Sequence, residues 1–400
     1  MVWIVGIVMF CANVSSVIVY AYGGVYLREV LHFDLASVGK VEGYVEALSN
    51  LMKLVSGVLS DAFQRRKILI LTGYGLIVGA RYLLAAASFL PAAYIAARSL
   101  ERIGNGVQAA PRSALVGDIA PHKRIGACYG LKRSLATLGS MIGAAVGIFI
   151  MAKTNNNYRA LFAFTAIPVT VGFFLLVFKV REPQRLRQAA VLASVPSHAP
   201  KYRTTFKLEN LKFLGTTYWK LMLVNFIFLL ARMGESLLSV YGRELHIELK
   251  HIGWVMITFN TAWCCASYPL GRIADRMSRY WLLLLGMASL VFADVVLMSA
   301  HTVSVFFFGV FLWGVQYGVT MNVFISLINE VVPENLRGTG IGFYWVTCAV
   351  ATYICDRVMT LIAKKYDTMR AAYEASGIVA VFALMSLIII MGYKIRKPRS

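Results

Sequence analysis

The sequence predicts an all-α membrane protein with twelve transmembrane helices arranged as two pseudo-symmetric six-helix bundles. Three observations support this prediction: 58% of the 400 residues are apolar, the mean hydropathy is +0.67, and the apolar runs are of helical length. A helix needs about 20 mostly apolar residues to cross the hydrocarbon layer, so this composition supplies roughly twelve spans. Little chain is left for soluble domains.

The apolar runs are separated by charged or turn-forming residues, which sets their order and orientation. They begin near residues 2, 38, 68, 92, 125, 159, 218, 252, 281, 303, 338 and 371. The loops after the even-numbered runs, together with the C-terminus, hold most of the lysine and arginine outside the runs. Both termini are therefore expected on the cytoplasmic side. The net charge of +21 follows from this topology and does not indicate nucleic-acid binding.

One connection, residues 181–217, is long and polar and contains several prolines and basic residues. Such a composition is typical of a linker. It is expected to lie in the cytoplasm and to join an N-terminal bundle, 1–180, to a C-terminal bundle, 218–400.

An internal repeat supports two related halves. Gly57-x-x-x-Asp61 recurs as Gly271-x-x-x-Asp275 at an offset of 214 residues. A second motif of tyrosine, arginine and glutamate recurs at an offset of 215, with Arg28-Glu29 answered by Arg243-Glu244. Parallel duplicated halves are a transporter architecture.

Several classes of protein lack support. The six cysteines all fall inside apolar runs, without a CxxC motif or a cluster with histidine, so neither a disulfide framework nor a metal site is expected. No phosphate loop or nucleophile motif is present, which argues against an enzyme, an ATP-driven pump and a bound cofactor. A cleaved signal peptide is not expected either, because the first apolar run lacks a basic segment before it. The expected partners are a small-molecule substrate, protons and the lipid bilayer, and the chain is expected to be a monomer.

Three motifs carry a family resemblance. Gly57 to Lys67 reads GVLSDAFQRRK, Pro269 to Arg279 reads PLGRIADRMSR, and Arg98 to Gly106 reads RSLERIGNG. In these motifs the chain resembles the major facilitator superfamily of secondary transporters, over essentially its whole length. The first motif keeps the glycine, the aspartate and the basic cluster of the family's loop between helices 2 and 3, but has Ala62 and Gln64 at positions where a basic residue and glycine are usual.

Other departures bear on the substrate. The resemblance implies acidic residues in helix 1, where this chain has Asn13 and Val17, and a proline in helix 5, where it has Ser140. Ser113 also stands where an aspartate is usual in the bacterial subgroup that the chain resembles. The first two differences weaken an inference of proton-driven drug antiport.

Charged residues in the N-terminal spans are candidates for a substrate and proton cavity. Glu42, Glu46 and Lys53 share one face of the second span at helical spacing, and Arg98, Glu101 and Arg102 form a charged face in the fourth. A charge near the bilayer centre costs at least about 2.5 kcal/mol, so such groups need a partner or a wet cavity. A guanidinium suits a carboxylate or phosphate of the solute. A purely structural lattice of Glu and Arg remains an alternative.

The C-terminal spans add a smaller set. Arg232 and Glu235 lie three residues apart in the seventh span, where they can pair with one another or face the cavity. Trp313, Gln316 and Tyr317 of the tenth span could form a stacking wall, or pack as core or interfacial residues.

Buried charges elsewhere in the chain have other expected roles. Arg81 and Asp294 occupy nearly equivalent repeat positions and are expected to support the bundle. Asp356 and Arg357 are adjacent and are expected to serve different partners.

The resemblance also implies a cytoplasmic gate. Its first copy would consist of Asp61, Arg65, Arg66, Arg112 and Asp118, and its second copy of Asp275, Arg276, Arg279 and Glu330. A plain alternative is that the basic residues of the first copy only fix the topology. We expect Asp61→Asn to weaken transport more than expression.

The leading hypothesis is a proton-coupled secondary transporter that moves a small anionic or zwitterionic organic solute by alternating access, such as an organic acid, a metabolite or a carboxylate siderophore. A multidrug efflux proton antiporter is the alternative, and a non-transporting receptor or lipid scramblase is a third. The short loops are typical of a protein of the bacterial cytoplasmic membrane.

Overall fold

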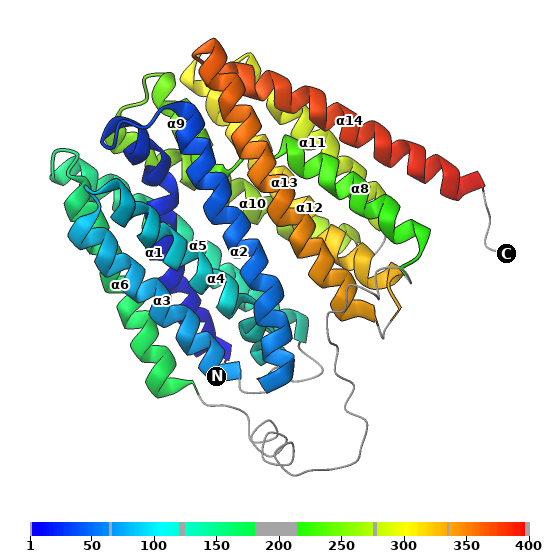
Figure 1. The fold of residues 1–400 in the computed structure, drawn as a ribbon, viewed down its shortest axis with the longest axis horizontal. Helices are drawn as coiled ribbons and strands as arrows, with labels where there is room; N and C mark the ends of the chain where they lie inside the picture. The colour runs from blue at the N-terminus through cyan, green and yellow to red at the C-terminus, as the bar shows by residue number, and fades with distance from the viewer. Residues whose placement is uncertain are drawn as a thin grey trace, which may run out of the picture. The chain divides into compact units, whose positions relative to one another are not determined.

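The computed structural model describes residues 2–63, 66–119, 125–180, 214–274, 278–333 and 336–396, and these residues form helices joined by short turns. A short 3-10 helix, Leu249–His251, also occurs in the described part of the chain. Figure 1 shows how the α-helices are arranged. The α-helices are, in chain order, α1 (Val2–Glu29), α2 (Leu35–Phe63), α3 (Arg66–Ala87), α4 (Pro91–Ile119), α5 (Ile125–Lys153), α6 (Tyr158–Lys179), α8 (Thr216–Ala231), α9 (Glu235–Glu244), α10 (Gly253–Ala274), α11 (Arg279–Met298), α12 (Val303–Val331), α13 (Arg337–Tyr366) and α14 (Met369–Arg396).

The twelve predicted spans are confirmed, because each predicted start lies within three residues of an observed helix start. The seventh span consists of α8 and α9 together. Within the described part of the chain, nine spans are long and apolar enough to cross a membrane by length and hydropathy alone. The other three, α2, α4 and α10, fall short of that standard, and α2 and α4 carry the buried charges that the sequence singles out.

Local signals explain where several helices begin and end. Asn157 precedes α6 and accepts hydrogen bonds from the backbone N–H groups of Arg159 and Ala160, as a side chain at the N-cap does. Thr302 caps α12 in the same way through the N–H of Val305. Asp367 lies between α13 and α14 in the left-handed conformation, with φ of 52°, a position that favours residues such as Asn, Asp and Gly.

The chain divides into two compact units that do not follow the order of the sequence. The first contains Met1–Val19 and Leu48–Leu211, and the second contains Tyr20–Ala47 and Lys212–Ser400. The end of α1 and the start of α2 therefore contact the helices of the C-terminal half. Most of the predicted linker, 181–217, lies outside the described residues.

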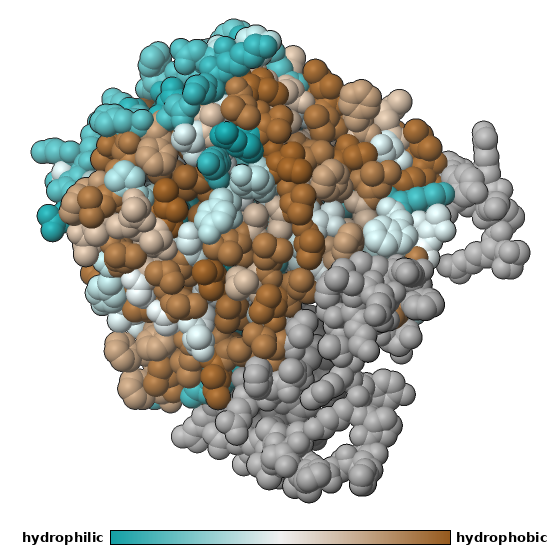
Figure 2. Space-filling model, in the orientation of Figure 1, coloured by the Kyte–Doolittle hydropathy of each residue, from teal (hydrophilic) through white to brown (hydrophobic). Residues whose placement is uncertain are grey.

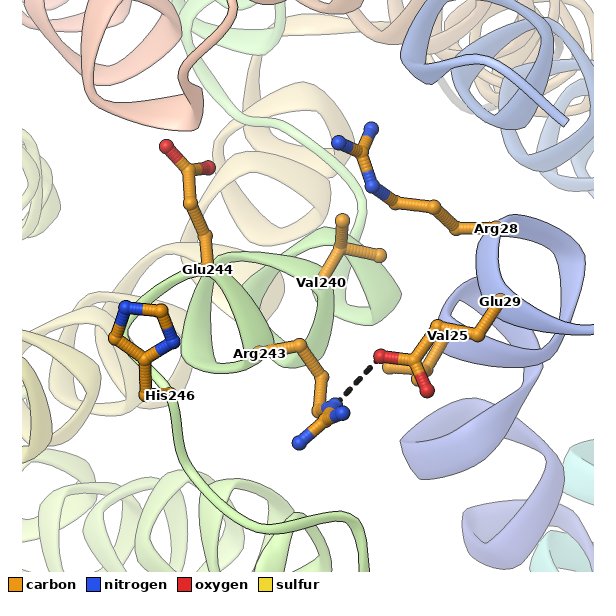
Figure 3. A pocket seen from close by; sticks show the side chains of 7 residues that line it. All are labelled: Val25, Arg28, Glu29, Val240, Arg243, Glu244 and His246. Atoms are coloured by element: carbon orange, nitrogen blue, oxygen red, sulfur yellow. Dashed lines mark hydrogen bonds and ion pairs between the residues drawn. The ribbon is translucent and has the colours of Figure 1, made fainter. Parts of the chain in front are cut away.

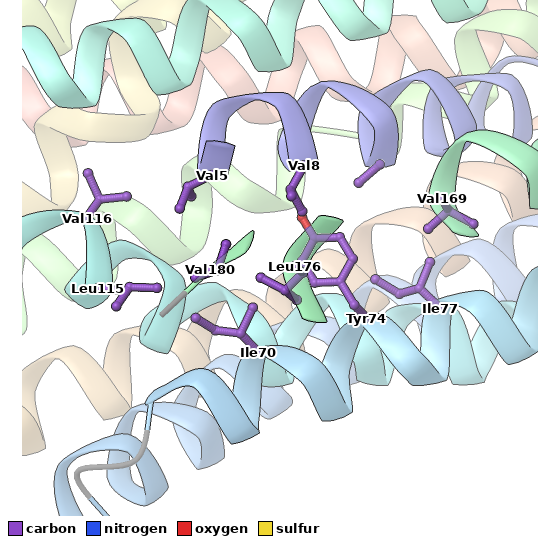
Figure 4. Close-up of a cluster of buried hydrophobic side chains, with 11 residues drawn as sticks. Val5, Val8, Ile70, Tyr74, Ile77, Leu115, Val116, Val169, Leu176 and Val180 are labelled. Carbon is purple, nitrogen blue, oxygen red and sulfur yellow. The ribbon is translucent and has the colours of Figure 1, made fainter. Parts of the chain in front are cut away.

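In the first unit α3 packs along α4 and α6. Its apolar core joins α1, α3, α4 and α6 (Figure 4). The fully or almost fully buried members of this core are Val5, Val8, Ala12, Ile70, Tyr74, Ile77, Leu115, Val116, Val169, Leu176 and Val180. Burial of each such side chain contributes about 1.5 to 3 kcal/mol in water, but in a bilayer close packing takes over part of that role.

In the second unit α12 packs against α10 and α11, and α14 packs against α8 and α11. Close approach requires glycine at one contact: a Cβ on Gly39 would lie 2.5 Å from the backbone oxygen of Asp356. The start of α2 thus lies directly on α13.

The outer surface of the helices is apolar. Hydrophobic residues cover much of the face shown in Figure 2. Large apolar side chains that are more than half exposed occur on several helices, among them Phe149, Phe178, Leu223, Phe382 and Ile389. A contiguous apolar surface on helices of this length is suited to lipid.

Candidate functional site

The seventh span is broken in its middle. α8 ends at Ala231, the residues Arg232, Met233 and Gly234 are not helical, and α9 begins at Glu235. Gly234 has φ of −63° and ψ of 141°, an extended conformation. Discontinuous transmembrane helices are the places where transporters expose backbone groups and helix ends to solutes and ions.

Both ends of the break are held by side chains from other helices of the second unit. The backbone N–H of Gly234 donates to Asp356 Oδ1 on α13 at 2.7 Å. The carbonyl oxygen of Ala231 accepts from Ser376 Oγ on α14 at 2.5 Å. Asp356 and Ser376 are both buried, at 2% and 0% exposure. Because backbone groups inside a membrane need partners, these two side chains make the break possible.

The charges at the break match the dipoles of the two half-helices. The N-terminus of α9 carries a partial positive charge and faces the Asp356 carboxylate, and the C-terminus of α8 carries a partial negative charge and ends at Arg232. The Arg232 guanidinium lies over the Tyr317 ring, with Cζ 4.4 Å from the ring centroid. A cation over an aromatic face is attracted by about 0.5 to 2 kcal/mol.

The break corrects one expectation from the sequence. Arg232 and Glu235 are not an i, i+3 pair on one continuous helix, because Arg232 terminates α8 and Glu235 starts α9. The physical reason is that Gly234 weakens the helix and the Asp356 carboxylate captures the Gly234 N–H that a continuous helix would bond internally. The charge of Glu235 still acts on Arg232.

The acidic residues of α2 belong to the same site. Glu42 is buried at 4% exposure, Glu46 is half-buried, and the charges of both act on Asp356. Their approach depends on Gly43, since a Cβ there would lie 3.0 Å from Asp356 Cβ. The Arg232 guanidinium therefore lies in the same part of the second unit as the carboxyl groups of Asp356, Glu42 and Glu46.

Arg98 and Glu101, predicted for the cavity, form a buried lattice with Arg81 in the first unit. Arg81 donates to the two Glu101 carboxylate oxygens at 2.9 and 2.6 Å, and Arg98 Nη1 donates to Glu101 Oε2 at 3.0 Å. Arg81 Nε also donates to Ser15 Oγ at 2.8 Å. None of the three charged side chains is more than 1% exposed. This geometry favours the structural alternative for Arg98 and Glu101.

Three further basic residues of the first unit have different surroundings. The Lys53 ammonium donates to Asn50 Oδ1 on the same helix at 2.8 Å. Arg112 donates to Gln108 Oε1 at 2.9 Å, and Arg102 is buried at 3% exposure. Their predicted roles stay predictions.

The aromatic residues Trp313 and Tyr317 of α12 lie against one another, with ring centroids 5.2 Å apart. Trp313 is 1% exposed and lies against Phe259 of α10, with ring centroids 6.0 Å apart, so it packs within the second unit. Tyr317 lies against Trp263 and presents its face to Arg232. Gln316 is fully buried, and its Oε1 accepts from Thr320.

The predicted gate is described only in part. Arg279 at the start of α11 pairs with Glu330 near the end of α12. Arg66 begins α3 and is half-buried. Arg65, Asp275 and Arg276 lie outside the described residues, and so do the side chains of Asp61 and Asp118.

A pocket of about 210 Å³ lies where α1 and α9 end, within the second unit (Figure 3). Its lining residues are Val25, Arg28, Glu29, Val240, Arg243, Glu244 and His246. Arg243 Nε donates to Glu29 Oε1 at 2.6 Å, which joins the two copies of the repeated motif. Glu244 accepts from the N–H of Met369 and caps α14.

Sequence reasoning did not assign Asp356 or Ser376 to the site. Asp356 and Arg357 do serve different partners, since Arg357 donates to the carbonyl of Ala36. A signal for the break was present: Gly234 followed directly by Glu235 and Ser236 is typical of a helix start. Which helix supplies the cap depends on tertiary packing, which no local pattern encodes.

Among the residues that the structure describes, no group of three or more His, Cys, Asp or Glu side chains could hold a metal ion. The groups that surround the break are carboxyl groups, a guanidinium, an aromatic ring and backbone dipoles. These groups can bind a small charged solute and exchange protons.

Comparison with known proteins gives consistent results. A family model described as Major Facilitator Superfamily matches residues 3–355 and again 221–400. An uncharacterized MFS-type transporter of Methanocaldococcus jannaschii is 22% identical over 393 residues, covering 95% of this chain and 94% of the relative. An uncharacterized protein of Mycobacterium tuberculosis is 25% identical over 370 residues, covering 90% of this chain and 85% of the relative.

Solved structures share the fold at low identity. A nucleoside transporter superposes with a TM-score of 0.78 at 11% identity, covering 97% of this chain and 99% of the other. A D-xylose-proton symporter gives 0.74 at 14% identity and covers 96% of both chains.

Proposed function

The chain belongs to the Major Facilitator Superfamily of secondary transporters, and from this premise we propose that it couples protons to the movement of a small organic solute that carries a carboxylate. As a member of this family it is a multi-pass membrane protein with a small-molecule substrate and is not an enzyme. The observation that carries the proposal is the break in the seventh span, with Arg232 at one half-helix and Asp356 at the other.

The surroundings of Arg232 support an anionic or zwitterionic solute. The Tyr317 ring covers one face of the guanidinium, so the N–H groups at its edge are directed sideways, where a solute carboxylate can accept two of them. Asp356, Glu42 and Glu46 lie in the same part of the unit and would attract an ammonium group of the solute. An amino acid or related zwitterion matches both charges.

The same carboxyl groups support proton coupling. Asp356 is buried and the charges of Glu42 and Glu46 act on it, so a negative charge on Asp356 is unfavourable. A solute that brings a positive charge to them, or a change in packing that exposes them, would release a proton. Alternating access supplies both events.

The orientation follows the distribution of basic residues. Both termini and the linker are placed in the cytoplasm, and the membrane is taken to be the bacterial cytoplasmic membrane. Labelling of single cysteines introduced near each terminus in intact cells tests this assignment.

Purified protein in liposomes that contain a pH-sensitive dye tests the proposed function. Amino acids, di- and tricarboxylates and lipophilic cations are added one at a time, and we expect a carboxylate-bearing solute to change the internal pH. Arg232→Gln should abolish the response, and Arg232→Lys should retain only part of it, because an ammonium cannot bind two oxygens in the same plane.

The matched control is Arg370→Gln, an arginine of the second unit whose side chain is 40% exposed, and it should respond like the wild type. A response to lipophilic cations alone would overturn the solute assignment and indicate drug efflux. A solute response without any pH change would overturn proton coupling.

A further inference from the structure

Asp294 is a buried carboxyl group that the substrate site does not explain. It lies on α11 with 0% exposure, and it makes no ion pair with any described residue. Helix α14 packs against it, because a Cβ on Gly377 would lie in ordinary van der Waals contact with Asp294 Cβ, at 3.5 Å.

The two hydrogen bonds at Ser376 Oγ need two protons, and the Ser376 hydroxyl supplies only one of them. Ser376 Oγ lies 2.6 Å from Asp294 Oδ2 and 2.5 Å from the carbonyl oxygen of Ala231. A hydroxyl has one proton to donate, and a carbonyl oxygen can only accept. If Asp294 were ionised, two acceptors would compete for a single proton and one short contact would join two oxygens without hydrogen between them.

A proton on Asp294 satisfies all three groups. The carboxylic acid then donates to Ser376 Oγ, and the Ser376 hydroxyl donates to Ala231. The neutral indole N–H of Trp313 also interacts with the Asp294 carboxyl group. It does not supply a proton between Asp294 Oδ2 and Ser376 Oγ, so the competition for the Ser376 hydroxyl proton remains.

The neighbours of Asp294 do not compensate a negative charge. From α14 the titratable group that faces it is Tyr373, and from α13 it is Cys355, both uncharged in their ordinary state. From α12 the facing group is the indole of Trp313. The thiols of Cys264 and Cys265 on α10 are exposed, whereas Asp294 is fully buried. A charge at such a position in a membrane costs at least about 2.5 kcal/mol.

We propose that Asp294 is a proton-binding site that acts on the break in the seventh span through Ser376. When Asp294 loses its proton, the Ser376 hydroxyl must turn to the new carboxylate and leave the Ala231 carbonyl without a donor. The end of α8, where Arg232 begins the break, then loses its cap. The protonation state of one carboxyl group thus decides which partner Ser376 serves, and this mechanism rests on the proposed proton coupling.

Infrared spectroscopy of the purified protein tests this site without knowledge of the solute. A protonated carboxylic acid has a carbonyl band separate from that of a carboxylate, and the band moves when the proton is exchanged for deuterium. We expect the Asp294→Asn variant to lose one such band at neutral pH. The side-chain amide that this substitution introduces would still donate an N–H to Ser376, so the fold should be kept, as thermal unfolding will verify.

Asp367→Asn provides the matched control, because Asp367 is an exposed aspartate in the same unit. Its spectrum should keep the band. Ser376→Ala should keep the band at a shifted frequency, since the acid loses the oxygen to which it donates. Identical carboxylic-acid regions for the wild type and Asp294→Asn would overturn the assignment.

Liposome measurements separate this proposal from the proposed function. If a solute produces proton movement in the wild type, Asp294→Asn should still exchange that solute across the membrane while its proton movement is lost. Full proton movement by Asp294→Asn would overturn the role of Asp294 in coupling. Absence of proton movement in the wild type would contradict the proposed function, whereas the infrared band would still report whether Asp294 is protonated.

Discussion

The carboxylate of Asp356 on α13 accepts a hydrogen bond of 2.7 Å from the backbone N–H of Gly234 at the start of α9. This bond joins two helices at the point where one of them is interrupted. The buried carboxyl group of Asp356 thus caps a half-helix, and the charges of Arg232, Glu42 and Glu46 in the proposed substrate site act on it. A change in the charge of Asp356 would therefore alter both the helix end and the site.

Removal of the Asp356 cap should lower stability. Loss of an N-cap costs about 0.5 to 2 kcal/mol, so Asp356→Ala should unfold at a lower temperature than the wild type in a thermal scan. Asp356→Asn should fall between them, because its amide oxygen can still accept the Gly234 N–H.

The control for this prediction is Asn157→Ala, which removes the cap of α6 in the first unit. It should lose similar stability while keeping solute-driven proton movement. Normal proton movement by Asp356→Ala would contradict the assignment of this residue to the site.

Glu101 should be the most sensitive charged residue of the first unit. Glu101→Gln would leave the guanidinium groups of Arg81 and Arg98 without a carboxylate in a fully buried place, and loss of one partner from a buried ion pair costs about 3 to 5 kcal/mol. The recovery of monodisperse protein after heating measures this loss.

Replacement of the whole lattice should be less harmful. The triple variant Arg81→Met, Arg98→Met and Glu101→Leu removes every charge of the lattice. Replacing a whole buried ion-pair network by apolar residues is often neutral for stability. Glu374→Gln, an exposed change on α14, should have no effect. Equal damage by Glu101→Gln and by the triple replacement would show that charge is not the cause.

The pair of Glu29 and Arg243 should contribute little to stability. Their side chains are 33% and 28% exposed, and exposed pairs are worth about 0.2 to 1 kcal/mol. A double-mutant cycle with Glu29→Gln and Arg243→Gln should give a coupling in that range that shrinks with added salt. The reversed pair, Glu29→Arg with Arg243→Glu, should recover part of this coupling free energy. A coupling that does not respond to salt would show that packing, not charge, joins these residues.

Asp34 should make stability depend on pH in the acid range. The hydrogen bond from the Lys364 side chain, followed by that from Ser37, lowers the pKa of Asp34 from 3.8 to about 2. A depressed folded-state pKa stabilises the protein above the unfolded value of about 3.9, and that contribution is lost as the pH falls from about 4 to about 2. The gain is small, because both side chains are largely exposed.

Thermal scans of the wild type and Asp34→Asn across this range check the prediction. The two proteins should differ most at neutral pH and converge in acid. Lys364→Gln should behave like Asp34→Asn, since it removes the main cause of the shift. A difference that grows as the pH falls would contradict this origin.

The sequence alone determined the spans and the fold class. Long and mostly apolar runs form helices in lipid because a helix pairs its own backbone groups. The charged and turn-forming residues between the runs allowed the helix starts to be predicted to within three residues. The repeated motifs also indicated duplicated halves. These features depend on local composition and spacing, which can be read from the sequence without knowledge of the tertiary contacts.

The tertiary structure decided which charges act together. Arg98 and Glu101 were predicted for a cavity, but Glu101 accepts hydrogen bonds both from Arg98 and from Arg81 of the neighbouring helix, and all three side chains are buried. The break at Arg232 forms because side chains of α13 and α14, more than 120 residues away, satisfy the backbone at its two ends. A buried polar group is defined by its partners, and partners that come from distant helices are fixed only when the helices pack.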